Sequence, residues 1–237
     1  LAEHFQGYLA GITADDVVKP YLDQFLPGRY FFSGMVACPQ ICNVGGRFQA
    51  DLPGLDESID IFGRTPPSSP TTAFIFDQTE PAEADPAFSM NLIYASNAWM
   101  RWQYNAPSGR YELWQEREVS EEELEDAPSF DSETGEPIAF ENIIYLFAPY
   151  TKADNHHYDI DFLPGKTPQA ALVLRDGAMV YAKWHTTDDF SPIILTGQEG
   201  QPLPLKPGRS WIVFVRSDSQ LNQPNPGEWE LAQPAVH

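Results

Sequence analysis

The residues best suited to chemistry in this sequence are histidines and carboxylates in the run 154–161. Alternate side chains of a β-strand point to the same side, so a strand here would place His157, Asp159 and Asp161 on one face. Imidazole and carboxylate groups on one face could bind a divalent metal ion. A solvated edge strand explains the same run without chemistry, because the adjacent histidines would point apart. We keep these three residues as metal candidates and otherwise predict no metal or cofactor.

The two cysteines of the chain, Cys38 and Cys42, are the second group of residues that could do chemistry. They are separated by three residues and lie beside Pro39 and the run 43–46, so a tight loop could close them into a disulfide. The alternative is two free buried thiols. Zinc would need two more ligands, and a redox Cys-x-x-Cys pair has one residue fewer between its cysteines. The disulfide would place the protein in an oxidising compartment.

Aromatic side chains offer a third option, a surface for sugar rings or peptide side chains. The aromatic residues that could contribute are Trp99, Trp102, Tyr104, Tyr111, Trp114 and Trp184. Core packing explains most of them more simply. In two places a polar neighbour indicates partial exposure, and these places supply the predicted binding surface: Trp99 with Arg101, and Trp184 with His185.

Signatures of the common catalytic classes are missing from the sequence. There is no Gly-x-Ser-x-Gly elbow, no His-Glu-x-x-His helix, no phosphate-binding Gly-x-x-x-x-Gly-Lys and no dinucleotide fingerprint after a strand. Carboxylates are numerous, but glycoside chemistry depends on a spatial separation that a sequence does not give. We therefore predict no catalytic residue, and the sequence favours a protein that is not an enzyme.

Alternating strands are the elements that must position these residues. In the run 98–104 the even-numbered side chains point one way and the odd-numbered ones the other. The turn-prone run 105–109 and the alternating run 110–114 complete an antiparallel hairpin. The run 171–184 predicts a second hairpin around Asp176-Gly177, a pair that tolerates the positive φ values of a type I′ turn.

Four further segments complete the pattern. The apolar runs 142–147 and 210–215 are typical of central strands buried on both faces. The proline-rich run 201–209 cannot supply a full ladder of backbone donors, so we expect it at an edge or in a connection. Ser120-Glu121-Glu122-Glu123 matches a capping box and predicts a short acidic helix.

Short turn-and-strand pieces follow one another in a fixed order along the second half of the chain. They are Trp102-Gln103-Tyr104, Ser108-Gly109-Arg110-Tyr111, Asp131-Ser132-Glu133-Thr134-Gly135, Glu141-Asn142-Ile143-Ile144, Leu174-Arg175-Asp176-Gly177, Lys183-Trp184 and Leu205-Lys206-Pro207-Gly208-Arg209-Ser210-Trp211-Ile212. The succession resembles the C-terminal domain of the YerB-like bacterial lipoproteins, extracytoplasmic proteins of undefined function. The resemblance implies that this chain is the C-terminal portion of a longer precursor. The chain departs from the family at 37–43, where the histidine of a Pro-His-Asn element is absent and two cysteines appear.

Composition bounds the classes of partner. The chain has 237 residues, of which 42% are hydrophobic, enough for one large core or two small ones. No run approaches the roughly 18 to 20 apolar residues of a membrane-spanning helix. The formal net charge of −20, from 34 acidic and 14 basic residues, repels phosphate backbones. We predict no nucleic-acid partner and no transmembrane segment.

The predicted fold is of the α+β class and mainly β. Residues 1–72 form a small α/β lobe that ends in a linker rich in proline, serine and threonine, with a helix start at 13–16. Residues 73–237 form a β-rich domain of antiparallel hairpins, arranged as a sandwich or a partly open barrel.

The resemblance and the absent motifs together suggest a function class. They imply a non-catalytic extracytoplasmic protein, at the bacterial cell surface or secreted, that binds or assembles with another macromolecule through an exposed sheet edge. The expected partner is an envelope protein or a glycan, and self-assembly is one version of this hypothesis. The alternative is an envelope hydrolase or transferase acting on glycan or peptide, which would need a polar cleft with a positioned histidine and carboxylate.

Overall fold

The structure is a computed structural model, and it describes residues 9–11, 19–25, 30–32, 41–44, 47–50, 74–95, 98–120, 123–152, 158–161, 167–187 and 191–234. The chain divides into two compact units. One contains residues 1–72 with 188–192, and the other contains residues 73–187 with 193–237.

The first unit holds short elements: β1 (Leu9–Gly11), α1 (Lys19–Phe25), β2 (Tyr30–Phe32), β3 (Ile41–Val44) and β4 (Arg47–Ala50). β1 pairs with β2 in parallel, and β3 pairs with β4 in antiparallel orientation. Pro20 lies in the first turn of α1, where its missing N–H breaks no helical hydrogen bond. The predicted helix start at 13–16 and the linker at 65–72 lie outside the described residues. None of the helices in the described part of the chain is long and apolar enough to cross a membrane.

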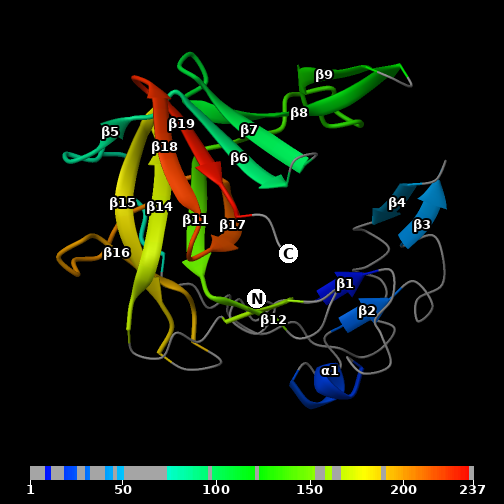
Figure 1. The fold of residues 1–237 in the computed structure, drawn as a ribbon, viewed down its shortest axis with the longest axis horizontal. Helices are drawn as coiled ribbons and strands as arrows, with labels where there is room; N and C mark the ends of the chain where they lie inside the picture. The colour runs from blue at the N-terminus through cyan, green and yellow to red at the C-terminus, as the bar shows by residue number, and fades with distance from the viewer. Residues whose placement is uncertain are drawn as a thin grey trace. The chain divides into compact units, whose positions relative to one another are not determined.

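A seven-stranded sheet forms one layer of the second unit (Figure 1). Its strands are β6 (Ser89–Ala95), β7 (Ala98–Asn105), β8 (Arg110–Ser120), β9 (Glu123–Pro128), β10 (Ala139–Phe140), β18 (Gln220–Asn225) and β19 (Glu228–Ala232). They lie in the order β10-β8-β7-β6-β19-β18, and β9 also pairs with β8. The pair β19 and β6 is parallel and the others are antiparallel, so the sheet is mixed.

A six-stranded sheet forms the other layer. Its strands are β5 (Asp85–Pro86), β11 (Asn142–Ala148), β14 (Gln169–Arg175), β15 (Ala178–His185), β16 (Ile194–Thr196) and β17 (Ser210–Arg216). They lie in the order β16-β15-β14-β11-β17, with β5 also beside β15, and the pair β11 and β17 is parallel. A small antiparallel pair, β12 (Tyr150–Lys152) and β13 (Tyr158–Ile160), follows β11 in the chain.

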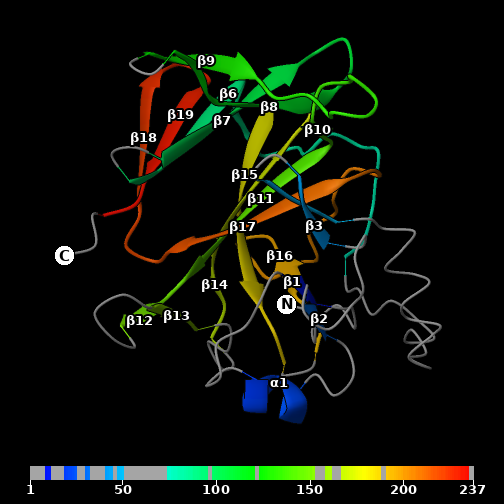
Figure 2. The same cartoon turned by 90° about the vertical axis from the view of Figure 1, so that its right-hand side faces the viewer.

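The hydrophobic core of this unit lies between the two sheets. Figure 2 shows the strands of one sheet crossing those of the other. The core takes buried side chains from both layers: Met90, Leu92, Trp102, Tyr111, Leu113, Trp229 and Leu231 from one, and Ile143, Tyr145, Leu172, Leu174, Met179, Val213 and Val215 from the other. The sheets are therefore two packed layers, as in a sandwich, and not a closed barrel. The predicted fold class is confirmed.

Both predicted hairpins are present in register. β7 and β8 pair from Met100 opposite Gln115 to Asn105 opposite Arg110. β14 and β15 pair up to Arg175 opposite Ala178, with Asp176-Gly177 forming the two-residue turn between them. The run 142–147 is a central strand buried on both faces, as predicted.

One strand prediction and one helix prediction were wrong. The run 210–215 is β17 at the edge of its sheet, where it pairs with β11 alone among the described strands, and its burial alternates along part of its length. The capping-box run 120–123 lies where β8 ends and β9 begins, and these strands pair from Trp114 opposite Pro128 to Ser120 opposite Glu123. Pairing with a neighbouring strand outweighs the local helix signal at this point.

Candidate functional site

The metal and disulfide candidates fall largely outside the described residues. His157 and Cys38 lie there, and only the backbone of Asp159 in β13 and of Cys42 in β3 is described. Asp161 is exposed. In the described part of the chain, no three or more histidine, cysteine, aspartate or glutamate side chains gather to hold a metal ion. The metal face and the disulfide both stay predictions.

Trp99 and Arg101 lie on the face of β7 that points away from the core, as the alternation predicts. The Arg101 guanidinium stacks over the ring of Trp114 on β8, at 4.7 Å from its centroid, and forms an ion pair with Asp126 on β9. The surface at Arg101 is therefore already occupied by contacts between neighbouring strands.

Trp184 corrects one part of the predicted binding surface. Its side chain is fully buried, its Nε1 donates to the Phe147 carbonyl at 2.8 Å, and its ring packs edge-on against Phe214. A buried indole needs a hydrogen-bond acceptor within the protein, and β11 supplies it here. The expected partial exposure of Trp184 is wrong. His185 is half-buried on the same strand, in a different sheet from Trp99 and Arg101, so these four residues do not share one strand or one sheet.

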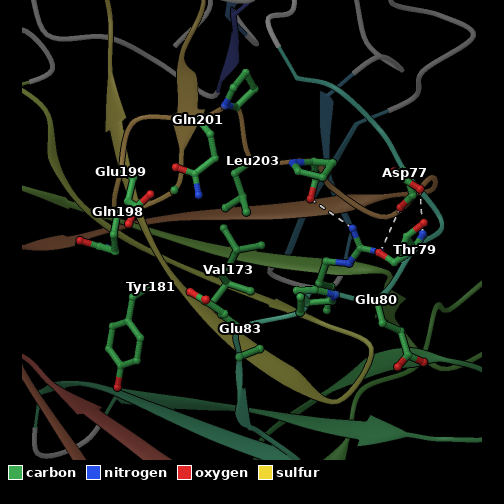
Figure 3. Close-up of a pocket in the computed structure, with 18 of the residues that line it drawn as sticks. Asp77, Thr79, Glu80, Glu83, Val173, Tyr181, Gln198, Glu199, Gln201 and Leu203 are labelled. Carbon is green, nitrogen blue, oxygen red and sulfur yellow. Dashed lines mark hydrogen bonds between the residues drawn. The ribbon is translucent and has the colours of Figure 1, made fainter.

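A groove of about 740 Å³ on the six-stranded sheet is a candidate site within the described residues (Figure 3). Three parts of the second unit line it: the segment 77–85, the strands β14 and β15, and the loop 197–204. Val173 and Leu203 lie at the centre of the view, with the carboxylates of Glu80 and Glu199 on opposite sides of them. The site therefore has an apolar centre and a charged rim.

Arg175 at the end of β14 ties the walls of the groove together. Its guanidinium donates to the carbonyl of Pro204 on one wall at 3.1 Å, and to those of Asp77 and Thr79 on the other wall at 3.0 Å each. Its Nε donates to Asp176 Oδ2 at 2.9 Å. The side chain is 2% exposed, and paired donors are what make such burial tolerable. The walls are fixed before any ligand arrives.

The turn after Arg175 holds the second half of this charge network. Asp176 has a φ of 55° and Gly177 one of 74°, the left-handed pair that a type I′ turn requires. Asp176 Oδ1 lies 2.7 Å from Lys206 Nζ, which also donates to the Gly109 carbonyl at 3.0 Å. One carboxylate therefore bridges two cations, and the network joins the groove to the β7–β8 turn.

The outer edge of β15 opens into the groove. β5 covers one end of this edge, where Asp85 is opposite Met179, and β16 covers the other, where Thr196 is opposite Lys183. Neither strand has a residue opposite Tyr181, which is 43% exposed and lines the groove. Partial burial raises the pKa of Tyr181. The negative charge of Asp85 raises that pKa further, and so does the hydrogen bond that its carboxylate accepts from the Tyr181 hydroxyl.

The lining of the groove is acidic. Its carboxylates are Asp77, Glu80, Glu83, Asp85 and Glu199, and its one cation is the engaged Arg175. The N–H of Thr79 donates to Asp77 Oδ1 at 2.8 Å, and the Thr79 hydroxyl also donates to this carboxylate. Together the two hydrogen bonds hold the pKa of Asp77 below its usual value. The described lining contains no histidine, cysteine, serine or lysine. The site is suited to binding a cation and offers no histidine and carboxylate pair.

No pattern in the sequence predicted this site. Its carboxylates are spread over 77–85 and 197–204, two loops that no spacing rule connects. The one available signal was Arg175, a charged residue that ends the buried run 171–174 just before the turn. A charge in such a place needs partners, and those partners are the groove walls.

Comparison with known proteins identifies a family and a fold. The sequence model for the C-terminal domain of a protein of unknown function, DUF3048, matches residues 90–212. Among solved structures, the chain is similar to the YerB protein from Bacillus subtilis, with a TM-score of 0.69 and 16% sequence identity over 90% of this chain and 69% of that one. At this identity the likeness shows the fold alone. No curated protein matches the chain. The predicted YerB-like fold is confirmed.

Proposed function

Since this chain belongs to DUF3048, a family of proteins of unknown function, through its C-terminal domain, we propose that it is a non-catalytic protein of the cell envelope that binds another macromolecule in the acidic groove. The partner is an envelope protein or a glycan, and a second copy of this chain is one version. The resemblance to YerB-like lipoproteins and the spacing of Cys38 and Cys42 support an extracytoplasmic location.

The observation that carries this proposal is the preformed groove. Arg175 fixes both walls, so a ligand that enters does not have to order them. A fixed site loses less entropy on binding than a flexible one. The volume of about 740 Å³ exceeds what a single ion needs and suits a segment of a larger molecule. The open edge of β15 inside the groove agrees with the expected contact through a sheet edge.

Site-specific cross-linking tests the proposal. A photoreactive amino acid replaces Gln198, an exposed groove residue, and a second version replaces Glu133, an exposed residue of the turn 131–135. Both are expressed in the source cells, whose envelope and cytosolic fractions are then irradiated separately. We expect a defined adduct from position 198 and none from position 133. Equal labelling from both positions, or an adduct formed only in the cytosol, would contradict the proposal.

The alternative of an envelope hydrolase or transferase makes a different prediction. Purified protein would convert peptidoglycan or peptides, and Glu83→Gln or Glu199→Gln would lower the rate at least tenfold, because hydrolysis needs a general acid or base. We expect no product from the unmodified chain by mass spectrometry. If the chain converts peptidoglycan or peptides and the rate depends on a groove carboxylate, its function is catalysis and the binding proposal is wrong.

A further inference from the structure

The proposed function leaves the chemical class of the partner open, and the residues that line the groove restrict which classes fit. We infer that the occupant is a polypeptide segment in an extended conformation that carries lysine or arginine side chains. This inference rests on the proposed function, since it concerns the same groove.

Charge is the first argument. Five carboxylates line the groove. The guanidinium among the lining residues, that of Arg175, already donates hydrogen bonds to Asp176 and to three carbonyls of the groove walls. The net charge of −20 adds to the negative field. A neutral glycan could donate hydroxyl hydrogen bonds to these carboxylates but would not neutralise them, and an anionic glycan or a second copy of this chain would be repelled. The ligand must bring positive charge.

The distribution of apolar and charged groups is the second argument. Among the apolar lining residues Leu203 is partly exposed while Val173 and Val180 are buried, and the carboxylates of Glu80 and Glu199 lie to either side of the centre (Figure 3). Lysine and arginine have a long apolar stem and a charged end, and they bury the stem while the end stays at a polar rim. The groove therefore matches these side chains better than it matches a compact cation.

The strand edge is the third argument. Between Asp85 on β5 and Thr196 on β16, the edge of β15 at 180–182 faces no described strand residue, although Gln198 Nε2 donates to the Ala182 carbonyl at 3.4 Å, a bond that an added strand would replace. An extended peptide offers N–H and C=O groups at the spacing of a neighbouring strand, and strand addition at open edges is a common mode of peptide recognition. A glycan has no repeating backbone amides of that spacing. The backbone of the ligand would lie along this edge, with its side chains directed alternately into the groove and away from it.

Direct binding of defined probes tests the inference. Fluorescein-labelled octalysine is titrated with the intact chain and followed by anisotropy. The comparison probes are octaglutamate, a neutral chitin octamer and a chitosan octamer, whose amines give a cationic glycan. Octalysine should bind, chitosan at least tenfold more weakly, and the other two not at all. Amide exchange at 180–182 should slow in the octalysine complex, because the ligand backbone covers that edge.

Two double variants of equal charge change show where the probe binds. Glu83→Gln with Glu199→Gln alters the groove, and Glu133→Gln with Glu136→Gln alters an exposed turn outside it. The groove variant should bind octalysine about tenfold more weakly, since it removes two of the five carboxylates that line the groove. The turn variant should bind as the unmodified chain does. All four positions are exposed, so both variants should fold, which circular dichroism checks.

The outcomes separate the inference from the proposed function. Equal weakening in both variants would mean attraction to overall charge and would overturn the inference. Chitosan binding as tightly as octalysine would overturn it too, while a groove-specific cross-link to a glycan would leave the proposed function intact. If octalysine does not bind and no cross-link forms at position 198, both the inference and the proposed function are contradicted.

Discussion

Tyr111 is the residue whose single hydroxyl links the two sheets. It comes from β8 and is fully buried, and its hydroxyl donates to the Ala87 carbonyl at 2.8 Å and lies 3.4 Å from that of Ala178 on β15. Burial raises the pKa of Tyr111 far above its usual value, and Tyr104 and Asp176 nearby raise it further. The folded state therefore keeps the proton that the unfolded chain releases near pH 10. The raised pKa of Tyr111 therefore stabilises the folded state fully below pH 10. This contribution is lost as the pH rises from 10 toward the pKa of Tyr111 in the folded state.

Tyr111→Phe should destabilise the chain by about 1–3 kcal/mol at pH 7, because the Ala87 carbonyl loses its donor inside the protein. Urea unfolding followed by tryptophan fluorescence measures this loss. The stability of the variant should also fall less steeply above pH 10 than that of the unmodified chain. Tyr181→Phe, at an exposed position, is the control and should change stability by less than about 0.5 kcal/mol. Equal stability of Tyr111→Phe and the unmodified chain would show that the buried bond contributes nothing.

Arg175 makes the sharpest residue-level prediction for the groove. Arg175→Met keeps a long side chain but leaves three wall carbonyls without their donor, and leaves Asp176 with Lys206 as its remaining cation. Removing one member of a buried ion pair costs about 3–5 kcal/mol. Amide exchange in 77–79 and 203–205 should quicken in the variant. Arg216→Met removes a more exposed ion pair, that with Asp218, and should cost less than about 1 kcal/mol. A larger loss from Arg216→Met would refute the role given to Arg175.

At the scale of elements, the β14–β15 turn requires its glycine for two reasons. Gly177 has a φ of 74°, and a Cβ added there would lie 2.8 Å from the ring of Tyr104. Gly135 has a φ of 70° and open space around the same position. Gly135→Ala should therefore cost about 1 kcal/mol from backbone strain alone, and Gly177→Ala at least about 1 kcal/mol more. Thermal unfolding measures the difference. Equal costs would mean that Tyr104 moves aside freely.

Elements set by neighbouring residues were predictable from the sequence, and those set by distant partners were not. Asp176-Gly177 fixes its hairpin because the turn geometry depends on two residues. The run 210–215 has the composition of a central strand, yet its place at the edge depends on its parallel pairing with β11, some 70 residues away. Composition does not encode which strand a run pairs with. The same limit hid the groove, since its two loops, 77–85 and 197–204, are far apart in the sequence and are brought together by long-range contacts such as the bond from the Asp77 N–H to the Leu205 carbonyl.

At the scale of the whole molecule, charge opposes folding at neutral pH. A net charge of −20 repels itself in the compact state, and protons taken up by the histidines and carboxylates of the chain as the pH falls relieve that repulsion. Three carboxylates among the described residues have the opposite effect, since their charged form stabilises the folded state. Hydrogen bonds to the N–H of Thr134, to Arg216 and to the N–H of Thr79 lower the pKa values of Asp131, Asp218 and Asp77 below the ordinary 3.8. A depressed folded pKa stabilises the fold above the unfolded value, and this contribution is lost as the pH falls below it.

These opposing effects predict a maximum of thermal stability on the acidic side of neutrality. At low salt the Tm should rise as the pH falls from 7 toward about 5, because repulsion weakens first. Below the ordinary carboxylate pKa of 3.8 it should fall again, as Asp77, Asp131 and Asp218 lose their charge and their hydrogen bonds. In 0.5 M NaCl the rise should shrink, since salt screens exposed charges beyond a few ångströms, while the acid-side loss should persist because those hydrogen bonds are short. Scanning calorimetry at both salt concentrations provides the check. A Tm that falls steadily from pH 7 to 5 at low salt would mean that local carboxylate contacts outweigh the overall charge of this chain.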